Sequence, residues 1–203
     1  MGTTTTFKGV NDPLSTKQYL DGLGRPVEVV KENYTPDGLH QKNYVTYDAL
    51  GRQSKTYLPF ESSALGFQAV PFTSSPHVKT EYEASPLSRP IKQINVDGTS
   101  VFTSYGSNNA TDVRIIADIS TSNTAFYPAN ELSKTTIINE NNKQTVVFKD
   151  KLGRVLLTRK TLDNENVDTY NMYDDYGQLV AVLPPGSVSG DGNVTNDLIF
   201  TYT

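Results

Sequence analysis

The sequence contains no cysteine and no tryptophan, and only two histidines, His40 and His77, occur among its 203 residues. Without cysteine the chain has neither a disulfide framework nor a thiolate metal site. Histidine is the commonest general base, and neither copy lies in a pattern that suggests a nucleophile beside a base. No pair of carboxylates for glycoside hydrolysis stands out among the 22 acidic residues. These absences predict a protein without catalysis and without a cofactor.

An excess of positive charge is also missing. The 18 Lys and Arg residues are outnumbered by 22 Asp and Glu, which gives a formal net charge of -4, so we expect no nucleic-acid partner. No run approaches the roughly 20 apolar residues of a membrane span. The first residues, MGTTTTFKG, lack the apolar stretch of a signal peptide. With 36% hydrophobic residues the chain is nevertheless apolar enough to bury a core.

What the chain has is aromatic and β-branched residues, interrupted at short intervals by turn formers. Twelve Tyr and eight Phe, with many Thr, Val and Ile, favour a pleated, half-buried surface. Fourteen Gly and eleven Pro, with abundant Asn, Asp and Ser, leave hardly any window of about 12 residues for an unbroken amphipathic helix. The sequence therefore predicts an all-β fold.

A five-residue pattern, Asp-x-Leu-Gly-Arg, returns along the chain. Three copies match it at all four fixed positions, and another replaces Leu by Tyr and Arg by Gln178. The segment 83–89, EASPLSR, resembles a copy lengthened by two residues. We expect a structural role for the repeat-turn residues, which are Asp21, Gly24, Arg25, Tyr47, Asp48, Gly51, Arg52, Asp150, Gly153, Arg154, Tyr173, Asp174 and Gly177.

Each copy lies between two strand-like arms, which predicts a β-hairpin. An Asp side chain accepts backbone N–H groups two residues further on, and Gly takes the left-handed conformation that reverses the chain. A further turn is expected at 140–142, because Asn tolerates positive φ better than most residues. The predicted organisation is a flexible segment over 1–16 and a repeat domain over 17–203, with hairpins near 17–31, 42–60, 77–96, 132–160 and 167–185.

The stretches between the hairpins, such as 106–112 and 123–130, are expected to be surface connections. The arm 179–183, LVAVL, is apolar at every position, which is typical of a strand covered on both faces. The last residues, DLIFTYT, are strand-like and stop where a further Tyr-Asp turn is expected, so we expect the repeat domain to be truncated at the C-terminus. An open strand edge at 198–202 predicts weak dimerisation by edge-to-edge pairing.

With these residues the pattern resembles the Rhs/YD-repeat family, in which a Tyr-Asp pair followed by a Gly-Arg turn marks each hairpin. YDALGR at 47–52 matches best, and YLDGLGRPVEVV and FKDKLGRVLLTRK are similar to the N-terminal repeat region of large Rhs proteins of Bacteroidetes-type bacteria. The likeness runs from about residue 17 to residue 203. The chain departs from the family pattern at Leu20 and Lys149, where Tyr is expected, and at Glu83, Ser88 and Gln178.

The resemblance implies serial antiparallel hairpins in a curved sheet or partial barrel, one arc of a hollow shell that encloses a C-terminal toxin or effector segment. It implies as partners the remaining repeats of a full-length chain and that enclosed effector. It also implies a secreted or surface-exposed bacterial protein in which this segment is scaffold and has no catalysis of its own. Related repeats occur in teneurins and in insecticidal toxin complexes.

Two other interpretations stay open. Exposed Tyr faces flanked by Asn, Asp and Arg could stack on sugar rings, as in a carbohydrate-binding or adhesion module at the cell surface with glycans as partners. The run containing Asp191, Asn193 and Asp197 places oxygen ligands at alternate positions, as a calcium loop does. That run lacks the turn Gly and the Glu at the twelfth position, so an ordinary polar loop is favoured over a metal site.

Overall fold

The computed structural model of the chain describes residues 2–6, 15–68, 75–117, 119, 123–163, 165–195 and 198–202. It confirms the all-β prediction, because the described elements are antiparallel strands that follow one another in hairpins. Within these residues we find no helix long and apolar enough to cross a membrane. The chain divides into two compact units, Met1–Ser100 and Val101–Thr203.

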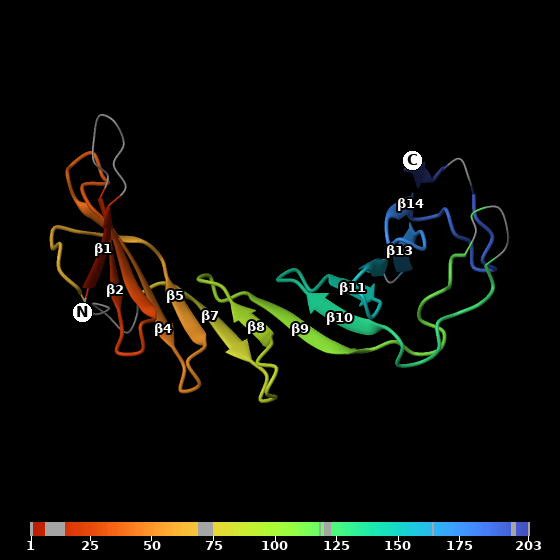
Figure 1. The fold of residues 1–203 in the computed structure, drawn as a ribbon, viewed down its shortest axis with the longest axis horizontal. Helices are drawn as coiled ribbons and strands as arrows, with labels where there is room; N and C mark the ends of the chain where they lie inside the picture. The colour runs from red at the N-terminus through yellow and green to blue at the C-terminus, as the bar shows by residue number, and fades with distance from the viewer. Residues whose placement is uncertain are drawn as a thin grey trace. The chain divides into compact units, whose positions relative to one another are not determined.

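The first unit is a sheet in which the strands pair antiparallel in the order β1-β2-β3-β4-β5-β7-β8, while β6 pairs with the beginning of β4 (Figure 1). Strand β1 lies in the segment for which the sequence predicted flexibility, and it pairs with β2 from Gly2–Tyr19 to Thr6–Ser15. The strands are β1 Gly2–Thr6, β2 Ser15–Leu20, β3 Pro26–Lys31, β4 His40–Tyr47, β5 Gln53–Tyr57, β6 Phe60–Ser62, β7 His77–Tyr82 and β8 Pro90–Ile94.

The second unit continues the same architecture in the order β9-β10-β11-β12-β13-β14-β15, again antiparallel throughout. Strand β9 begins at the last residue of the first unit. The strands are β9 Ser100–Ser107, β10 Ser133–Ile138, β11 Gln144–Lys149, β12 Val155–Leu162, β13 Glu165–Tyr173, β14 Leu179–Leu183 and β15 Phe200–Thr201.

The repeat hairpins share one irregularity of register. In each, the ladder shifts by one residue directly before the turn, at Tyr19/Leu20, Thr46/Tyr47, Glu81/Tyr82, Phe148/Lys149 and Met172/Tyr173. A three-residue loop, a type I turn followed by one residue in the left-handed conformation, forms such a bulge. The repeat therefore specifies one turn type.

One face of the second unit carries its core. Strand β11 buries Val146 and Phe148 at alternate positions, as expected when a single face is covered. Strand β14 does the same with Ala181 and Leu183, while Leu179 is 36% exposed. The prediction that the arm 179–183 is covered on both faces is therefore wrong, because its apolar residues are buried only at every second position.

Two excursions from the sheet cover this core. The segment between β9 and β10 contributes Val113 and Leu132, which expose 0% and 2% of their surface, and the segment after β14 packs Val188 and Val194 against the core cluster. Val113 and Leu132 lie just beyond the stretches 106–112 and 123–130 that were expected to be surface connections, and those stretches themselves contain the buried residues Asn108 and Asn123. The sequence of these connecting stretches shows no apolar periodicity, because single residues rather than whole strands or helices enter the core.

The first unit has a smaller covered face. Val30 and Tyr57 are buried there, and the segment that follows β6 lies over strands β2 to β4. Phe67 packs against Tyr19 and Tyr44, with ring centroids 5.7 Å and 6.3 Å away, and the Tyr19 hydroxyl donates to the carbonyl oxygen of Leu65 at 3.0 Å.

Candidate functional site

The repeat turn is closed by one carboxylate. In the turn that begins at Asp48, Oδ1 accepts the backbone N–H groups of Leu50 and Arg52, both at 2.9 Å. Oδ2 accepts Nε of Arg52 at 2.8 Å. The backbone adds a bond from the Asp48 N–H to the Arg52 carbonyl and one from the Gly51 N–H to the Asp48 carbonyl. The turns at Asp21 and Asp150 repeat every one of these bonds.

Glycine is required in these turns by backbone geometry. Gly51 has φ of +79°, in the left-handed region that costs other residues about 1–2 kcal/mol. Space is a second requirement at this position, because a Cβ on Gly51 would lie 2.7 Å from Nη1 of Arg25, the arginine of the preceding repeat. The other repeat glycines, Gly24, Gly153 and Gly177, also have positive φ.

The two irregular copies keep the turn by substitution. In the copy at Asp174 the carboxylate still accepts the N–H groups of Tyr176 and Gln178, but Gln178 supplies no cation. In the lengthened copy Glu83 binds Arg89 through both carboxylate oxygens, at 2.8 Å and 2.9 Å. Ser85 takes over the tip, because its Oγ accepts the Leu87 N–H and donates to Glu83. Ser88 stands in the Gly position with φ of +50°.

The same backbone turn recurs where the pattern Asp-x-Leu-Gly-Arg is absent. At Asn139, Oδ1 accepts the N–H groups of Asn141 and Lys143, and Asn142 takes positive φ. Turns with the same pair of backbone bonds begin at Thr35, Asn95 and Ser189. The sequence signal that would have found them is a Thr, Asn or Ser three residues before Gly or Asn, since these side chains also accept backbone N–H groups.

Three of the turn arginines connect their repeat to the next one. The guanidinium carbon of Arg25 lies 4.3 Å from the centroid of the Tyr47 ring, and the Tyr47 hydroxyl donates to the Pro26 carbonyl at 2.7 Å. The guanidinium of Arg52 lies over the ring of Tyr82 in the same way, and the Tyr82 hydroxyl donates to the Gln53 carbonyl.

The second unit contains the same contact. The guanidinium of Arg154 lies over the ring of Tyr173, and the Tyr173 hydroxyl donates to the Val155 carbonyl. A tyrosine thus binds the arginine side chain and the next backbone carbonyl of the preceding turn.

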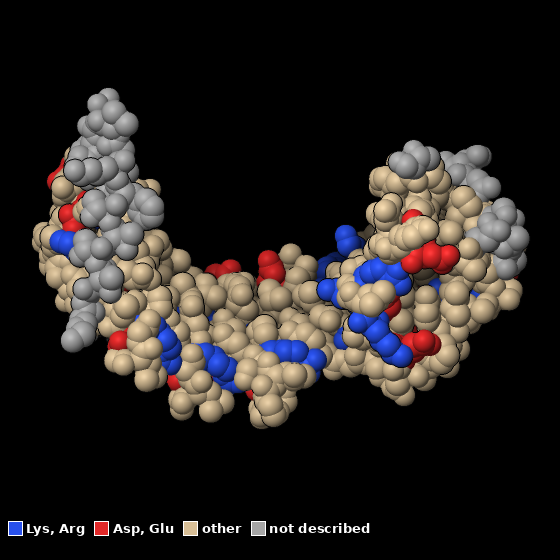
Figure 2. Space-filling view, viewed as in Figure 1, with Lys and Arg blue, Asp and Glu red and all other residues tan. Residues whose placement is uncertain are grey.

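This connection was missed by sequence reasoning, which expected a structural role for the Tyr, Asp and Arg of each turn but no contact between successive repeats. The signal was present as the Tyr that directly precedes Asp48 and Asp174. Guanidinium groups cover one face of Tyr47, Tyr82 and Tyr173, so these rings give no support to a glycan-binding surface. Basic side chains recur along the hairpin ends of the first unit in Figure 2.

The carboxylates of the turns have lowered pKa values. The backbone N–H of Arg25, followed by its side chain, lowers the pKa of Asp21, and the backbone N–H of Arg52 does the same for Asp48. Burial acts to raise the pKa of Asp150, but the hydrogen bonds from Arg154 outweigh it. The Arg89 side chain and the Ser85 hydroxyl lower the pKa of Glu83 to about 2. These groups are therefore ionised at neutral pH.

A buried ion pair holds the covering segment of the first unit. Glu28 and Lys42 expose 1% and 0% of their surface, and Lys42 Nζ lies 3.0 Å from Glu28 Oε1. Lys42 also donates to the Gly66 carbonyl at 2.6 Å, and Glu28 Oε2 accepts the Gln68 N–H at 2.8 Å. The pair thus fixes the backbone of residues 66–68 on the sheet.

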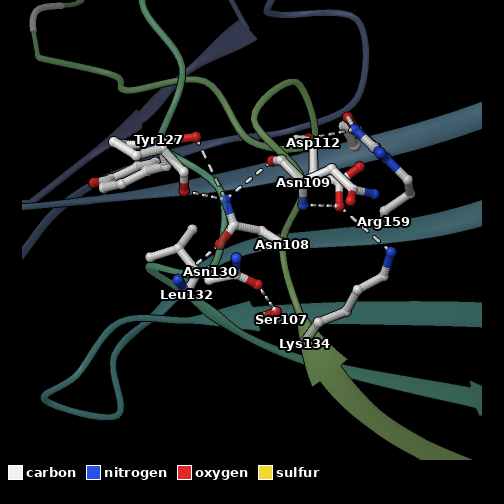
Figure 3. Close-up of polar contacts among 11 residues, drawn as sticks. Ser107, Asn108, Asn109, Asp112, Tyr127, Asn130, Leu132, Lys134 and Arg159 are labelled. Atoms are coloured by element: carbon white, nitrogen blue, oxygen red, sulfur yellow. Dashed lines mark hydrogen bonds and ion pairs between the residues drawn. The ribbon is translucent and has the colours of Figure 1, made fainter.

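In the second unit the buried side-chain amide of Asn108 holds a covering segment in the same way (Figure 3). Asn108 Nδ2 donates to the carbonyls of Asn109 and Pro128, at 3.0 Å and 2.8 Å, while its Oδ1 accepts the Leu132 N–H at 2.8 Å. Both ends of the excursion between β9 and β10 are therefore held by one side chain. Beside it Arg159 binds Asp168 with two bonds of 2.7 Å and donates to the carbonyl of Asp112.

The other residues singled out in the sequence have structural surroundings. His40 Nδ1 accepts the Asn33 N–H, and His77 Nδ1 lies 2.8 Å from the Ser75 carbonyl. The carboxylate of Asp191 is engaged by Ser189 and Asn193 inside the turn 189–193, and Asp197 lies outside the described residues. Among the residues that the structure describes, no group of three His, Cys, Asp or Glu side chains is placed to hold a metal ion.

Solved structures with this fold include large toxin assemblies. A crystal structure of TcdB2-TccC3-Cdc42 matches with a TM-score of 0.60 and 18% identity, over 91% of this chain and 10% of the other. TcdB2-TccC3 without its hypervariable C-terminal region matches with 0.59 and 18%, over 92% and 10%. The Photorhabdus luminescens Tc holotoxin pore matches with 0.55 and 16%, over 91% and 10%. The chain thus spans about a tenth of the length of these chains.

No curated protein matches the sequence. One family model does, described as a domain of unknown function, DUF6443, and it covers residues 2–115. This stretch holds the first unit with its three repeat turns and reaches into the second. Since it is more than half of the sequence, the chain belongs to the DUF6443 family.

Proposed function

We propose that this chain is a wall segment of a Rhs/YD-type shell in a toxin-like protein. It acts as scaffold and has no catalysis of its own. Its partners are the remaining repeats of a longer chain and a C-terminal effector segment that the shell encloses. The observation that carries the proposal is the contact of three turn arginines, Arg25, Arg52 and Arg154, with the tyrosine of the following repeat.

This contact gives a hairpin array the means to extend. A two-stranded hairpin alone is marginal in water and needs a neighbour on each side. Here the neighbour is specified twice, by the strand ladder and by the Arg–Tyr contact, and the same pair of residue types is used in both units. An array of this kind grows by adding the same module, as a wall requires.

The comparisons support the toxin-like assignment. The fold is shared with TcdB2-TccC3 and with a Tc holotoxin, and the name of one of these structures mentions a hypervariable C-terminal region. A wall of shared fold joined to a hypervariable C-terminal segment is the organisation expected of a container with exchangeable contents. Because the chain spans about 10% of those chains, a closed container needs further repeats.

In this proposal the repeat-turn residues are structural, and the full-length protein is secreted or exposed at the cell surface. Residues 17–203 belong to one repeat array. The edge at 198–202, where Leu198, Phe200 and Tyr202 are exposed, pairs weakly with a second copy when no further repeat covers it. A mass that stays monomeric in light scattering over a wide concentration range would contradict this pairing.

The test of the main proposal uses the full-length protein that contains this segment. Electron cryomicroscopy is expected to show a hollow particle whose wall includes this chain and whose interior holds the C-terminal segment. Limited proteolysis is expected to spare that segment until Arg52 and Tyr82 are both replaced by Ala, which removes one coupling contact. An extended particle without an interior, or a C-terminal segment cut as fast in the wild type as in the variant, would overturn the proposal.

A further inference from the structure

An exposed leucine stands at the tip of each repeat turn in the first unit. Leu23, Leu50 and Leu87 expose 79%, 73% and 69% of their surface. Because successive strands alternate in direction, the turns β2–β3, β4–β5 and β7–β8 lie at the same end of the strands, along one side of the sheet (Figure 1). We call these three leucines the tip row. In the second unit Leu152 and Tyr176 occupy the same turn position and expose 78% and 91%.

The turn itself keeps these side chains in solvent. The backbone N–H groups of Leu23 and Leu50 are bound by the turn carboxylates of Asp21 and Asp48, and that of Leu87 by Ser85. Leu23 and Leu50 are therefore fixed between Asp and Gly, and Leu87 between Ser85 and Ser88, at the outermost point of the reversal, where no strand passes over them. An apolar residue at a position that only solvent reaches adds nothing to the stability of its own hairpin.

The tip row is also held rigidly. Arg25 extends from its own turn to the ring of Tyr47 and lies against Gly51, so the first two tips are tied together. Arg52 donates to the Glu83 carbonyl and to Ser88, which ties the second tip to the third. Neighbouring tips are two strands apart, or roughly 9.5 Å. A preorganised row of this kind loses little conformational entropy when it docks.

The charges beneath the tips cancel. Each turn pairs its acid with its own arginine, at 2.7 Å for Asp21–Arg25 and 2.8 Å for both Asp48–Arg52 and Glu83–Arg89. The rim is therefore apolar at its outermost points and close to neutral below them. It suits an apolar, uncharged partner with a matching repeat distance rather than an acidic polymer.

We propose that the tip row docks against a second row of tips from another stretch of the same repeat array, with the leucines of one row between those of the other. A second row built on the same turn has the same spacing and the same neutral base. Three leucines offer roughly 200–350 Å², well below the roughly 800 Å² per partner of a stable complex. The contact is therefore weak between free molecules and effective between neighbouring stretches of one long chain. This inference rests on the proposed wall function.

The absence of cysteine makes the contact easy to trap, because Leu50→Cys introduces the sole thiol. A second copy of this chain is the probe for the neighbouring row. Under mild oxidation, disulfide-linked dimers of Leu50→Cys are expected to form at least tenfold faster than dimers of the control Leu58→Cys, which is also exposed but lies outside the turn. Adding Leu23→Ser and Leu87→Ser to Leu50→Cys is expected to lower the rate to that of the control.

Equal rates at the two positions, or a rate that the serine substitutions leave unchanged, would overturn the tip contact. The hollow particle of the full-length protein would then still support the wall function, so the two failures are distinguishable. Flotation with phosphatidylcholine vesicles tests whether the tip row binds a lipid surface instead of a second row of tips. Vesicle binding that is lost in the Leu23→Ser, Leu50→Ser, Leu87→Ser variant would assign the row to a lipid surface and would equally overturn the proposal.

Discussion

The guanidinium of Arg25 lies on the ring of Tyr47, 4.3 Å from its centroid, while the Tyr47 hydroxyl donates to the carbonyl of Pro26. The two residues are 22 positions apart in the chain and belong to successive repeats. Arg25 is also bound by Asp21 of its own turn. The arginine therefore serves two turns at once, and its removal affects both.

This relationship predicts a measurable coupling. We expect Arg25→Ala and Tyr47→Leu to be non-additive, with a coupling free energy of about 0.5–1 kcal/mol, the size of an exposed cation–π contact. The measurement is a double-mutant cycle by urea unfolding, followed by tyrosine fluorescence because the chain has no Trp. Arg25 and Tyr173, which lie in different units, form the control pair. If the two substitutions at Arg25 and Tyr47 were additive within about 0.3 kcal/mol, the contact would make no contribution to the stability of the array.

Two glycines with the same backbone conformation distinguish the cost of positive φ from the cost of displacing a neighbouring side chain. Gly51 and Gly153 have φ of +79° and +83°, but only at Gly51 would a Cβ meet Arg25. Both Gly→Ala variants are expected to lose about 1–2 kcal/mol through the left-handed conformation. Gly51→Ala is expected to lose about 0.5–1 kcal/mol more, since Arg25 must leave the Tyr47 ring.

The control for the glycine comparison is Gly51→Ala in the Arg25→Ala background, where the additional loss is expected to vanish. The variant Arg52→Ala loses the exposed pair with Asp48, about 0–1 kcal/mol, and the Tyr82 contact, about 0.5–1 kcal/mol. Gly51→Val is expected to be more destabilised, because it strains the left-handed turn, by about 1–2 kcal/mol, and also displaces Arg25. Equal urea midpoints for the last two variants would contradict the turn model.

The buried pair of the first unit predicts a different pattern. Lys42→Met leaves the Glu28 carboxylate buried without its cation, and we expect a loss of about 3–5 kcal/mol. The double variant Glu28→Leu, Lys42→Met is expected to be more stable than Lys42→Met alone, because no unpaired charge remains. Urea unfolding compares the three proteins. A double variant less stable than the single one would mean that the hydrogen bonds to residues 66–68 outweigh the cost of the unpaired charge.

The lengthened repeat predicts an acid transition. The pKa of Glu83 falls from 4.5 to about 2 in the folded chain through Arg89 and Ser85. A group with a lowered folded pKa stabilises the fold above its unfolded pKa and loses that contribution as the pH falls through the folded value. The wild type is therefore expected to lose stability between pH 4.5 and pH 2 more steeply than Glu83→Gln. Identical pH profiles of the unfolding midpoint would contradict the assignment.

The turn chemistry could be predicted from sequence because it is local. Asp, Gly and Arg stand within five residues, and the bonds from Leu50 and Arg52 to Asp48 depend on nothing else. The burial of polar side chains by segments far away in the sequence could not be predicted. Lys42 and Glu28 look like the polar residues of an exposed strand, but the distant segment at 66–68 binds both of them in a buried position.

The covering excursions show the same limit. Asn108 reads as one polar residue in a run of turn formers, yet it joins Asn109, Pro128 and Leu132 in space. Its importance depends on residues about 20 positions away, for which the sequence offers no spacing rule. The arm 179–183 misled for the opposite reason, because its hydrophobicity is uniform while only Ala181 and Leu183 are buried.

The contact between turns has a direction. Arg25 lies on Tyr47, Arg52 on Tyr82 and Arg154 on Tyr173, so the arginine always comes first in the chain and the tyrosine later. During synthesis from the N-terminus, a finished hairpin therefore presents a guanidinium, already oriented by its own aspartate, before the ring that covers it has left the ribosome. Each new repeat therefore completes a contact whose arginine the preceding repeat has already oriented, and an array of such hairpins can assemble in the order of its translation.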